Sequence, residues 1–117
     1  MGSFMLIVHD YITMAELEVM SEKMFGKLVK AVVDLQQEIM VVDAFMHVDE
    51  EDLLLENGSQ QEDLWGINLH PSRPQEEFVE FDSMINVRPA DNNVTRGVDD
   101  ALLRAKIIAL VNQLVRR

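Results

Sequence analysis

Hydrophobic and polar residues alternate most regularly in two stretches of the chain, which are separated by a proline-containing segment. Successive side chains of a strand point to opposite faces, so residues two apart share a face. In the first stretch Trp65, Ile67 and Leu69 share one face, and Gly66, Asn68 and His70 share the other. In the second stretch the apolar face consists of Val79, Phe81, Ser83, Ile85 and Val87, and the polar face of Glu80, Asp82, Met84, Asn86 and Arg88. This alternation predicts half-buried strands over 64–70 and 79–87.

The connection between these strands contains two of the three prolines. Proline lacks the backbone donor that a sheet interior requires, so it favours a loop there. We therefore predict an antiparallel hairpin over 64–88. Its two apolar sides must face the same way, because a slip of one residue would expose one of them. One register that meets this condition sets Asn68 opposite Glu80 and Gly66 opposite Asp82, with a gap beside the carboxylates where Gly66 lacks a side chain.

The other elements follow from periodicity and from signals at their ends. We predict strands over 5–9, 28–35 and 38–45, and helices from Thr13 to about residue 25, over 50–56 and from residue 99 or 100 to about 115. Thr13 and Glu16 form a capping box, in which each side chain bonds the backbone N–H of the other residue. Gly26 stands where a left-handed cap would end the first helix. Asp49 is expected to cap the short helix, and Asn57 to end it.

The predicted order is strand, helix, strand, strand, short helix, strand, strand, helix. Hairpins dominate this order, so we predict an α+β fold with a mainly antiparallel sheet of about five strands, two long helices and one short helix. The strands over 28–35 and 38–45 are fairly apolar on both faces, which indicates a central position in the sheet. The chain has 117 residues and no visible repeat or linker, so residues 5–117 are expected to form a single domain.

The composition excludes several classes of protein. Hydrophobic residues make up 48% of the chain, which argues against general disorder. Cysteine is absent, so neither a disulfide framework nor thiolate chemistry is available. No apolar run approaches the ~18 residues of a membrane span. We also see no signal peptide, and therefore expect a cytoplasmic protein without a membrane partner.

Charge is distributed unevenly along the chain, whose formal net charge is −11. Residues 34–82 contain fourteen acids and one base, whereas residues 83–117 contain three acids and six bases. Affinity for nucleic acid rests on lysine and arginine neutralising phosphates, so the acidic middle opposes direct nucleic-acid binding. We interpret the acidity mainly as a source of solubility.

The polar face of the predicted hairpin would bring Asn68, His70, Glu80 and Asp82 together. Carboxylate and imidazole groups suit a divalent metal. Glu80 and Asp82 would lie ~6.5 to 7 Å apart along the strand, close enough to share an ion. A metal-dependent hydrolase that activates water at these two residues is therefore the enzyme alternative. A solvated sheet face is the simpler interpretation, and we favour it.

Residues 47–52 also combine a histidine with several acids. They lack the alternating oxygens and the central glycine of a calcium loop. An acidic helix start, where carboxylates complement the positive end of the helix dipole, explains them more simply.

Three arginines, Arg88, Arg96 and Arg104, form the other group of interest. Together they would suit a phosphate or carboxylate ligand, since Arg96 comes shortly before a helix N-terminus, where anions bind readily. The alternative is that Arg96 pairs with an acid, namely Asp99, Asp82 or Glu80, and so fixes its loop to the sheet. We favour this alternative.

Three blocks of the sequence resemble a known family. They run from Glu62 to Asn68, from Glu80 to Pro89 and from Thr95 to Asp99, and the likeness extends from about Met5 onward. The family is an uncharacterised one of small prokaryotic proteins, catalogued as domain of unknown function 5674. The resemblance implies a prokaryotic, cytoplasmic protein. It implies no activity and no catalytic residue.

The function is predicted from the catalytic and phosphate-binding motifs that the sequence lacks. The chain contains no Gly-rich phosphate loop, no nucleophile elbow and no His-Glu-x-x-His motif. We therefore predict a small non-enzymatic interaction or ligand-binding domain, with the hydrolase as the alternative. A small-molecule ligand of unknown identity is expected, without a metal ion or another cofactor, at Asn68, Glu80, Asp82, Asn86, Arg88 and Arg96.

Two further expectations concern apolar surfaces. The last helix carries an apolar stripe wider than one sheet contact needs, because it is broadened by Leu102, Ile108, Val111 and Val115. This width predicts a homo-oligomer. Trp65, by contrast, is expected inside, under one of the two long helices, as a major contributor to the core.

Overall fold

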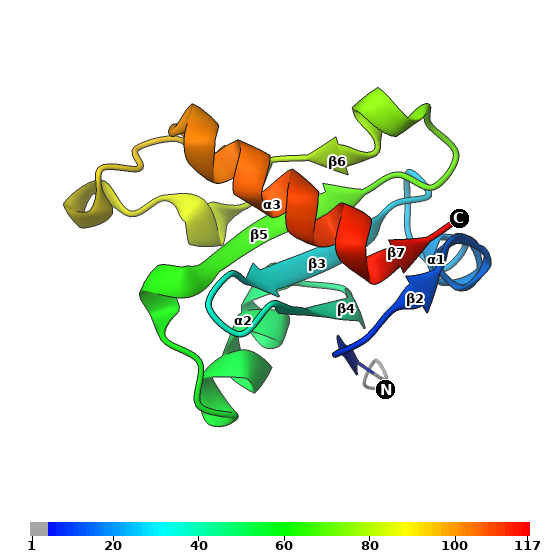
Figure 1. Ribbon diagram of the computed structural model, residues 1–117, viewed down its shortest axis with the longest axis horizontal. Coiled ribbons are helices and arrows are strands. Elements are labelled where there is room, and N and C mark those ends of the chain that lie inside the picture. Colours follow the sequence, from blue (N-terminus) through cyan, green and yellow to red (C-terminus); the bar gives the residue numbers. More distant parts are fainter. Residues whose placement is uncertain (1–4) are drawn as a thin grey trace.

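The computed structural model describes residues 5–117 (Figure 1). Its strands are β1 (Leu6–Val8), β2 (Ile12–Thr13), β3 (Val29–Asp34), β4 (Ile39–Ala44), β5 (Leu64–Leu69), β6 (Val79–Glu80) and β7 (Val115–Arg116). Its α-helices are α1 (Met14–Ser21), α2 (His47–Glu56) and α3 (Ala101–Leu114). Short 3-10 helices lie at Gln61–Asp63, Gln75–Glu77, Met84–Asn86 and Pro89–Asp91.

Within residues 5–117 the main sheet has five strands in the order β1-β4-β3-β5-β6, and each neighbouring pair is antiparallel. β2 and β7 form a separate parallel pair. The predicted α+β fold with a five-stranded antiparallel sheet is therefore confirmed. β3 is the central strand, between β4 and β5, as the apolar residues on both of its faces predict.

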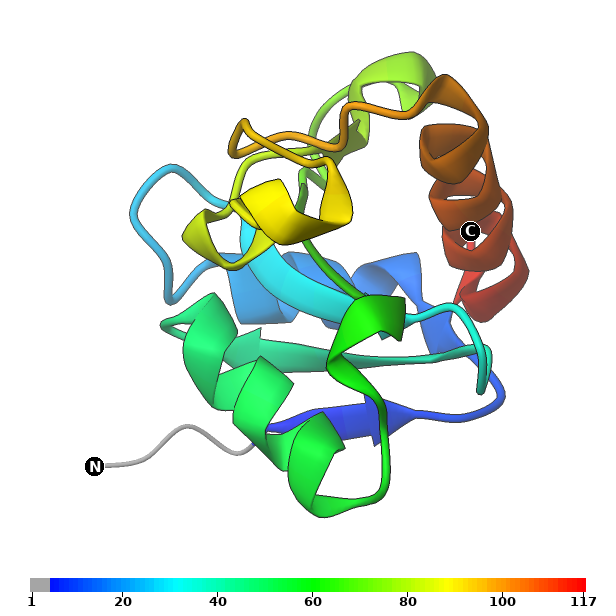
Figure 2. The same cartoon turned by 90° about the vertical axis from the view of Figure 1, so that its left-hand side faces the viewer.

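Helices cover both faces of the sheet, and Figure 2 shows α2 and α3 on opposite sides of it. The larger core cluster joins α1 and α3 to one face of the sheet, where Leu17 and Ile107 pack with Ile67. The smaller cluster lies under α2 and consists of Val32, Val41, Leu54 and Leu64. Trp65 belongs to the larger cluster and is only 5% exposed, so its predicted burial is confirmed.

The predicted capping box of α1 is present. Thr13 Oγ1 accepts from the Glu16 N–H at 3.1 Å, and Glu16 Oε1 accepts from the Thr13 N–H at 3.1 Å. The helix is shorter than predicted, however, because it ends at Ser21. Ser21 Oγ donates to the Glu18 carbonyl at 2.7 Å, a local bond that competes with helix continuation. Gly26 does adopt a positive φ, but in the turn that follows the helix.

α2 also departs from its predicted start. It begins at His47 rather than at residue 50, and Asn57 is its C-cap, as expected. The N-cap residue is Met46, whose side chain offers no acceptor, and no side chain caps the helix. Asp49 lies inside the first turn instead, where its negative charge favours the positive helix end without a capping bond.

The predicted strand over 79–87 is wrong beyond Glu80. β6 pairs with β5 only at two positions, Asn68 with Glu80 and Leu69 with Val79. The predicted opposition of Asn68 and Glu80 is thus confirmed. That of Gly66 and Asp82 is wrong, because the chain leaves the sheet before it reaches Gly66.

Gly66 explains why the strand stops. A Cβ atom on Gly66 would lie 2.6 Å from Ser83 Oγ, so the chain after β6 passes directly over this glycine. The Asn86 side chain then takes the place of a neighbouring strand, because its amide bonds both the N–H and the C=O of Gly66. The gap predicted beside Gly66 is therefore filled by Ser83.

Candidate functional site

The segment after β6, residues 81–100 (yellow-green to orange in Figure 1), is held against β5 by the buried Asn86 and braced internally by the buried Asn93. Asn86 donates to the carbonyls of Gly66 and Arg96, both at 2.9 Å. Asn93 donates in turn to the Asn86 carbonyl at 2.8 Å. These bonds fix the backbone that carries Arg96. They also place the Asn86 amide, a predicted ligand-binding group, inside the fold.

Arg88, another predicted ligand-binding residue, is part of the core packing. Its guanidinium lies 4.0 Å from the centre of the Trp65 ring, a cation–π contact. Nη1 donates to the Gln61 carbonyl at 2.8 Å, and Nε lies 3.7 Å from Asp91 Oδ2. The side chain is 10% exposed. Arg88 therefore anchors the segment to the sheet beside Trp65.

The other two arginines have separate partners. Arg96 Nε donates to Asp82 Oδ1 at 2.6 Å, which is one of the three pairings considered from the sequence. Arg104 Nη1 donates to the carbonyls of Val98 at 2.6 Å and Asp99 at 3.2 Å, just before α3. The three arginines thus have three different sets of partners, and Arg96 lines a hollow in the described surface.

Asn68, His70 and Glu80 meet at the end of the β5–β6 pair. Glu80 Oε1 accepts from Asn68 Nδ2 at 3.0 Å and lies 3.0 Å from His70 Nε2. These bonds, first that of His70 and then that of Asn68, lower the pKa of Glu80. Asn68 Nδ2 also reaches the Asp82 carbonyl at 3.3 Å. The polar face predicted from the alternation is therefore a hydrogen-bonded network.

This network does not assemble a set of metal ligands. Among residues 5–117 no three histidine or acidic side chains are grouped so that they could hold a metal ion. Glu80 is engaged by Asn68 and His70, and Asp82 by Arg96. The metal-dependent hydrolase therefore stays a prediction made from the sequence.

A hollow of about 160 Å³ lies on the α2 side of the sheet. Figure 2 shows the two segments that border it, the start of α2 and the yellow segment after β6. We call it the α2 hollow. Its lining residues are Lys30 of β3, Met46, His47 and Val48 at the start of α2, and Ser83, Met84, Ile85 and Arg96 after β6.

Two cations, Lys30 and Arg96, line the α2 hollow. Lys30 is half-buried, and no carboxylate in the described part of the chain forms an ion pair with it. Arg96 uses Nε for Asp82, so its terminal nitrogens remain for another acceptor. The N-terminus of α2 has no side-chain cap, and its first residues line the same hollow. Uncapped N–H groups and the helix dipole favour an anion there.

His47 also lines this hollow. Its Nε2 lies 2.7 Å from the Ile67 carbonyl oxygen, which can only accept, so Nε2 carries the proton. Burial lowers the pKa of the imidazole from its usual 6.5, and Lys30 and Arg96 add to this effect. The ring is therefore neutral at pH 7, with a lone pair on Nδ1. Within residues 5–117, Nδ1 has no hydrogen-bond partner.

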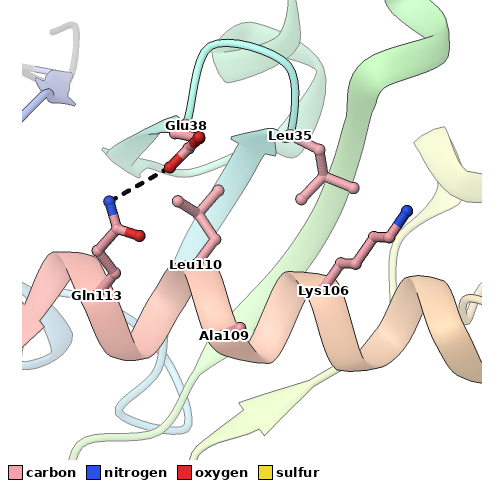
Figure 3. Close-up of a pocket in the computed structure, with 6 residues that line it drawn as sticks. All are labelled: Leu35, Glu38, Lys106, Ala109, Leu110 and Gln113. Carbon is pink, nitrogen blue, oxygen red and sulfur yellow. Dashed lines mark hydrogen bonds between the residues drawn. The ribbon is translucent and has the colours of Figure 1, made fainter.

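Two other hollows lie on the α3 side, and their linings contain fewer cations than that of the α2 hollow. Figure 3 shows the first, of about 240 Å³, whose lining includes Leu35 and Leu110, and where Gln113 Nε2 donates to Glu38 Oε1 at 3.4 Å. Lys106 is the only cation in its lining. The second, of about 260 Å³, is lined by Gln75, Glu76, Phe78, Val79, Ile108 and Asn112. Neither combines two cations with a helix N-terminus.

Sequence reasoning missed Lys30 and His47. Lys30 is an ordinary polar position of a predicted strand, and His47 was included in an acidic helix start. In the structure the β3–β5 pairing sets Lys30 beside Asn68 on the polar face. This pairing would have indicated Lys30, but it does not follow from local periodicity in the sequence.

Comparison with known proteins gives one result. The sequence model of a family described as "Protein of unknown function (DUF5674)" matches residues 6–114. Neither the curated proteins nor the solved structures contain a match. In residues 5–117 no helix has the length and apolar character needed to cross a membrane. The chain therefore belongs to the DUF5674 family of proteins of unknown function, as its sequence blocks predict.

Proposed function

We propose that this protein is a small ligand-binding domain that takes a carboxylate with a short apolar tail in the α2 hollow. The observation that carries the proposal is Lys30, a half-buried cation with no carboxylate partner among the described residues. Acids outnumber bases by eleven in the chain, so a lysine at this depth would ordinarily find a partner. Here the positive end of α2 and Arg96 share its surroundings, and an anion would satisfy all three.

The apolar part of the ligand follows from the rim of the hollow. Met46 and Met84 are 56% and 64% exposed, and Val48 and Ile85 lie beside them. Methionine side chains adapt to ligands of varied shape, which makes them common at binding surfaces. A carboxylate that carries a short hydrocarbon tail would cover this rim while its charge meets Lys30 and Arg96.

The predicted ligand-binding residues then divide into three roles. Arg96 would contact the ligand directly. Asp82 would orient Arg96, while Asn68 and Glu80 would support the strand end beside Lys30. Asn86 and Arg88 would act from inside the fold by fixing the segment that carries Arg96.

Calorimetric titration with 4-methylpentanoate and with inorganic phosphate tests the proposal. We expect 4-methylpentanoate to bind, and Lys30→Met to weaken its binding by about 10-fold or more, because bonds to charged groups contribute ~1.5–3 kcal/mol. Lys106→Met on α3, across the sheet from the hollow, is the matched control and should change nothing. If neither 4-methylpentanoate nor phosphate binds, the proposal is refuted. It is also refuted if Lys30→Met and Lys106→Met weaken the binding of 4-methylpentanoate equally.

Self-association is a second candidate function, and the outer face of α3 favours it. Leu102 is 76% exposed and Ile108 41% exposed, next to the exposed Ala105 and Ala109. Of the stripe predicted from the sequence, Val111 and Val115 are buried in the fold, so Leu102 and Ile108 are what a second copy would meet. Apolar surface gathered on one face in this way is typical of interaction sites.

The setting of this function is also a proposal. Residues 5–117 would act as one domain in the cytoplasm of a prokaryote. The acidic residues 34–82 support the expectation that nucleic acid is not a direct partner.

A further inference from the structure

Glu50 is a carboxyl that the fold buries under α2 with a single hydrogen-bond partner. It belongs to the first turn of α2 and is fully buried, and its Oε2 accepts from the Ala44 N–H at 3.2 Å. Its Oε1 is also buried and has no partner among the described residues. An ionised carboxylate there would lose its hydration in exchange for one bond to a neutral donor, which is strongly unfavourable. These contacts therefore favour the protonated carboxyl.

The Glu50 carboxyl and the Lys30 side chain share the space between α2 and the sheet. Lys30 pairs in register with Ala44, the residue whose N–H Glu50 accepts, so the two side chains occupy adjacent positions under the helix. Lys30 also lines the α2 hollow together with residues 46–48, which immediately precede Glu50 on the chain. The two charged groups nevertheless form no ion pair. A protonated Glu50 accounts for this, because a neutral carboxyl leaves the charge of Lys30 uncompensated.

The other charged groups around Glu50 are acidic. Asp43 lies on β4, where Lys23 pairs with it at 2.6 Å, and Asp49 lies on α2 itself. Burial raises the pKa of Glu50 well above 4.5, and the charges of these two aspartates add to the effect. The 3-10 helix Met84–Asn86 also packs against α2, but it contains no titratable residue.

We propose that the α2 hollow binds its carboxylate ligand together with one proton, which Glu50 holds. An ionised Glu50 and a bound anion compete for the charge of Lys30 and repel each other. A protonated Glu50 leaves Lys30 to the ligand. This inference rests on the proposed function above. It adds a regulation of the site by pH, through a carboxyl that is not part of the lining of the hollow.

The sign of the pH dependence follows from this competition. A bound anion adds negative charge beside Glu50 and raises the pKa of its carboxyl further. Affinity is therefore highest below the pKa that Glu50 has in the ligand-free protein. It falls as pH rises through that pKa, because each binding event must then take up a proton, and it levels off above the pKa of the complex. His47 is already neutral at pH 7, because burial lowers its pKa from 6.5.

Calorimetric titration with 4-methylpentanoate between about pH 6 and pH 9 tests the inference, since the carboxyl of this probe resembles that of glutamate, which titrates near ~4.3. Repeating the titrations in buffers of different ionisation enthalpy counts the protons taken up on binding. We expect the wild type to take up a fraction of a proton and to lose affinity by about 10-fold across this range, as one unit charge close to the ligand implies. Glu50→Gln keeps the shape and stays neutral. It should bind as tightly as the wild type does at the acidic end, without proton uptake and without the loss of affinity.

Glu51→Gln is the matched control. Glu51 follows Glu50 on the same helix and is also buried, but its Oε2 accepts from Gln61 Nε2 at 3.5 Å, and it is not among the residues that line the α2 hollow. This variant should keep the proton uptake of the wild type.

Carbon NMR of the wild-type glutamate carboxyls gives a second measurement, which serves if Glu50→Gln does not fold. At a pH where Glu50 is partly ionised in the ligand-free protein, 4-methylpentanoate should shift its signal toward that of a protonated carboxyl. The exposed Glu56 on the same helix is the internal control, and its signal should not move.

The outcomes separate the inference from the proposed function. Binding of 4-methylpentanoate without proton uptake would overturn the role of Glu50 and leave the carboxylate site in place. Proton uptake that persists in Glu50→Gln would assign the proton to another group, such as His47, and would overturn the inference as well. If 4-methylpentanoate does not bind at any pH in this range, the carboxylate site of the proposed function fails, and the inference fails with it.

Discussion

The Asn86 side chain hydrogen-bonds both backbone groups of Gly66, accepting from its N–H at 2.8 Å and donating to its C=O at 2.9 Å. A neighbouring strand would ordinarily supply these two bonds. Here one side-chain amide supplies them, and the same Nδ2 also reaches the Arg96 carbonyl. Asn86 therefore joins the edge of the sheet to the segment that carries a residue of the candidate site.

Removing the Asn86 amide should destabilise the protein strongly. In Asn86→Ala, the buried N–H and C=O of Gly66 both lose their partner, and each such group costs about 1–3 kcal/mol. We expect the free energy of unfolding to fall by about 3 kcal/mol or more, measured by urea denaturation. Asn112→Ala on the exposed side of α3 is the control and should have little effect. A loss below about 1 kcal/mol would mean that water replaces the amide.

Gly66 should tolerate no side chain while Ser83 covers it. A Cβ on residue 66 would lie 2.6 Å from Ser83 Oγ and 2.7 Å from Ser83 Cβ, distances that force the chain to move. Gly66→Ala should therefore destabilise by about 1–3 kcal/mol, as overpacking does. Adding Ser83→Gly removes both atoms, so the double variant should regain part of the loss. Additive losses in urea melts of the three variants would show that the contact is not the cause.

Trp65 should contribute more to stability than any exposed residue of the sheet. It is buried in the larger core cluster, and Arg88 stacks on its ring at 4.0 Å. Trp65→Ala should lower the free energy of unfolding by about 3 to 5 kcal/mol, as large-to-small core changes do. Fluorescence of the wild type should show an emission maximum shifted to the blue of free tryptophan. An emission maximum near that of free tryptophan, with a mild effect of the substitution, would contradict the burial.

Self-association through α3 should depend on Leu102. We expect light scattering across a concentration series to show a dimer or larger assembly, and Leu102→Asp to return the protein to a monomer without unfolding it, since this side chain is largely exposed. Leu55→Asp, at an exposed position of α2 on the opposite face, is the control. A wild-type monomer at high concentration would refute the second candidate function.

Alternation in the sequence predicted the start of the β5–β6 pair because burial determines which face each side chain takes. The register of Asn68 and Glu80 followed directly from that rule. The same rule failed after Glu80, although Phe81, Ser83 and Ile85 continue the pattern. Periodicity reports burial and not the partner of each backbone group, and here a side-chain amide replaces the strand.

The sequence predicted only some residues of the candidate site, and the reason why it missed the others is related. Arg96 and Asp82 were identified, and their ion pair was one of the alternatives. Lys30 and His47 were not, because they come from elements that the fold brings together across a large sequence separation. No local pattern indicates that the start of α2 lies beside the segment after β6. A tertiary arrangement of this kind follows from the packing of α2 on the sheet.

Glu50 is a buried carboxyl in the first turn of α2. Its Oε2 accepts from the Ala44 N–H at 3.2 Å, and its Oε1 has no partner among the described residues. Burial is the main reason why the pKa of Glu50 is raised well above 4.5, and the Asp43 and Asp49 charges add to this. The folded protein therefore holds the Glu50 proton over a range of pH in which the unfolded chain releases it.

This difference fixes the sign of a pH effect. Above pH 4.5 the folded state binds more protons at Glu50 than the unfolded state does, so its contribution to stability falls as pH rises, until the folded pKa is passed. Glu50→Gln keeps the shape and removes the titration. Its stability relative to the wild type should therefore increase steadily from pH 4.5 upward, in urea melts at matched salt. Glu56→Gln, an exposed position of the same helix, should follow the wild-type curve. Parallel curves for wild type and Glu50→Gln would show that Glu50 titrates normally in the folded protein.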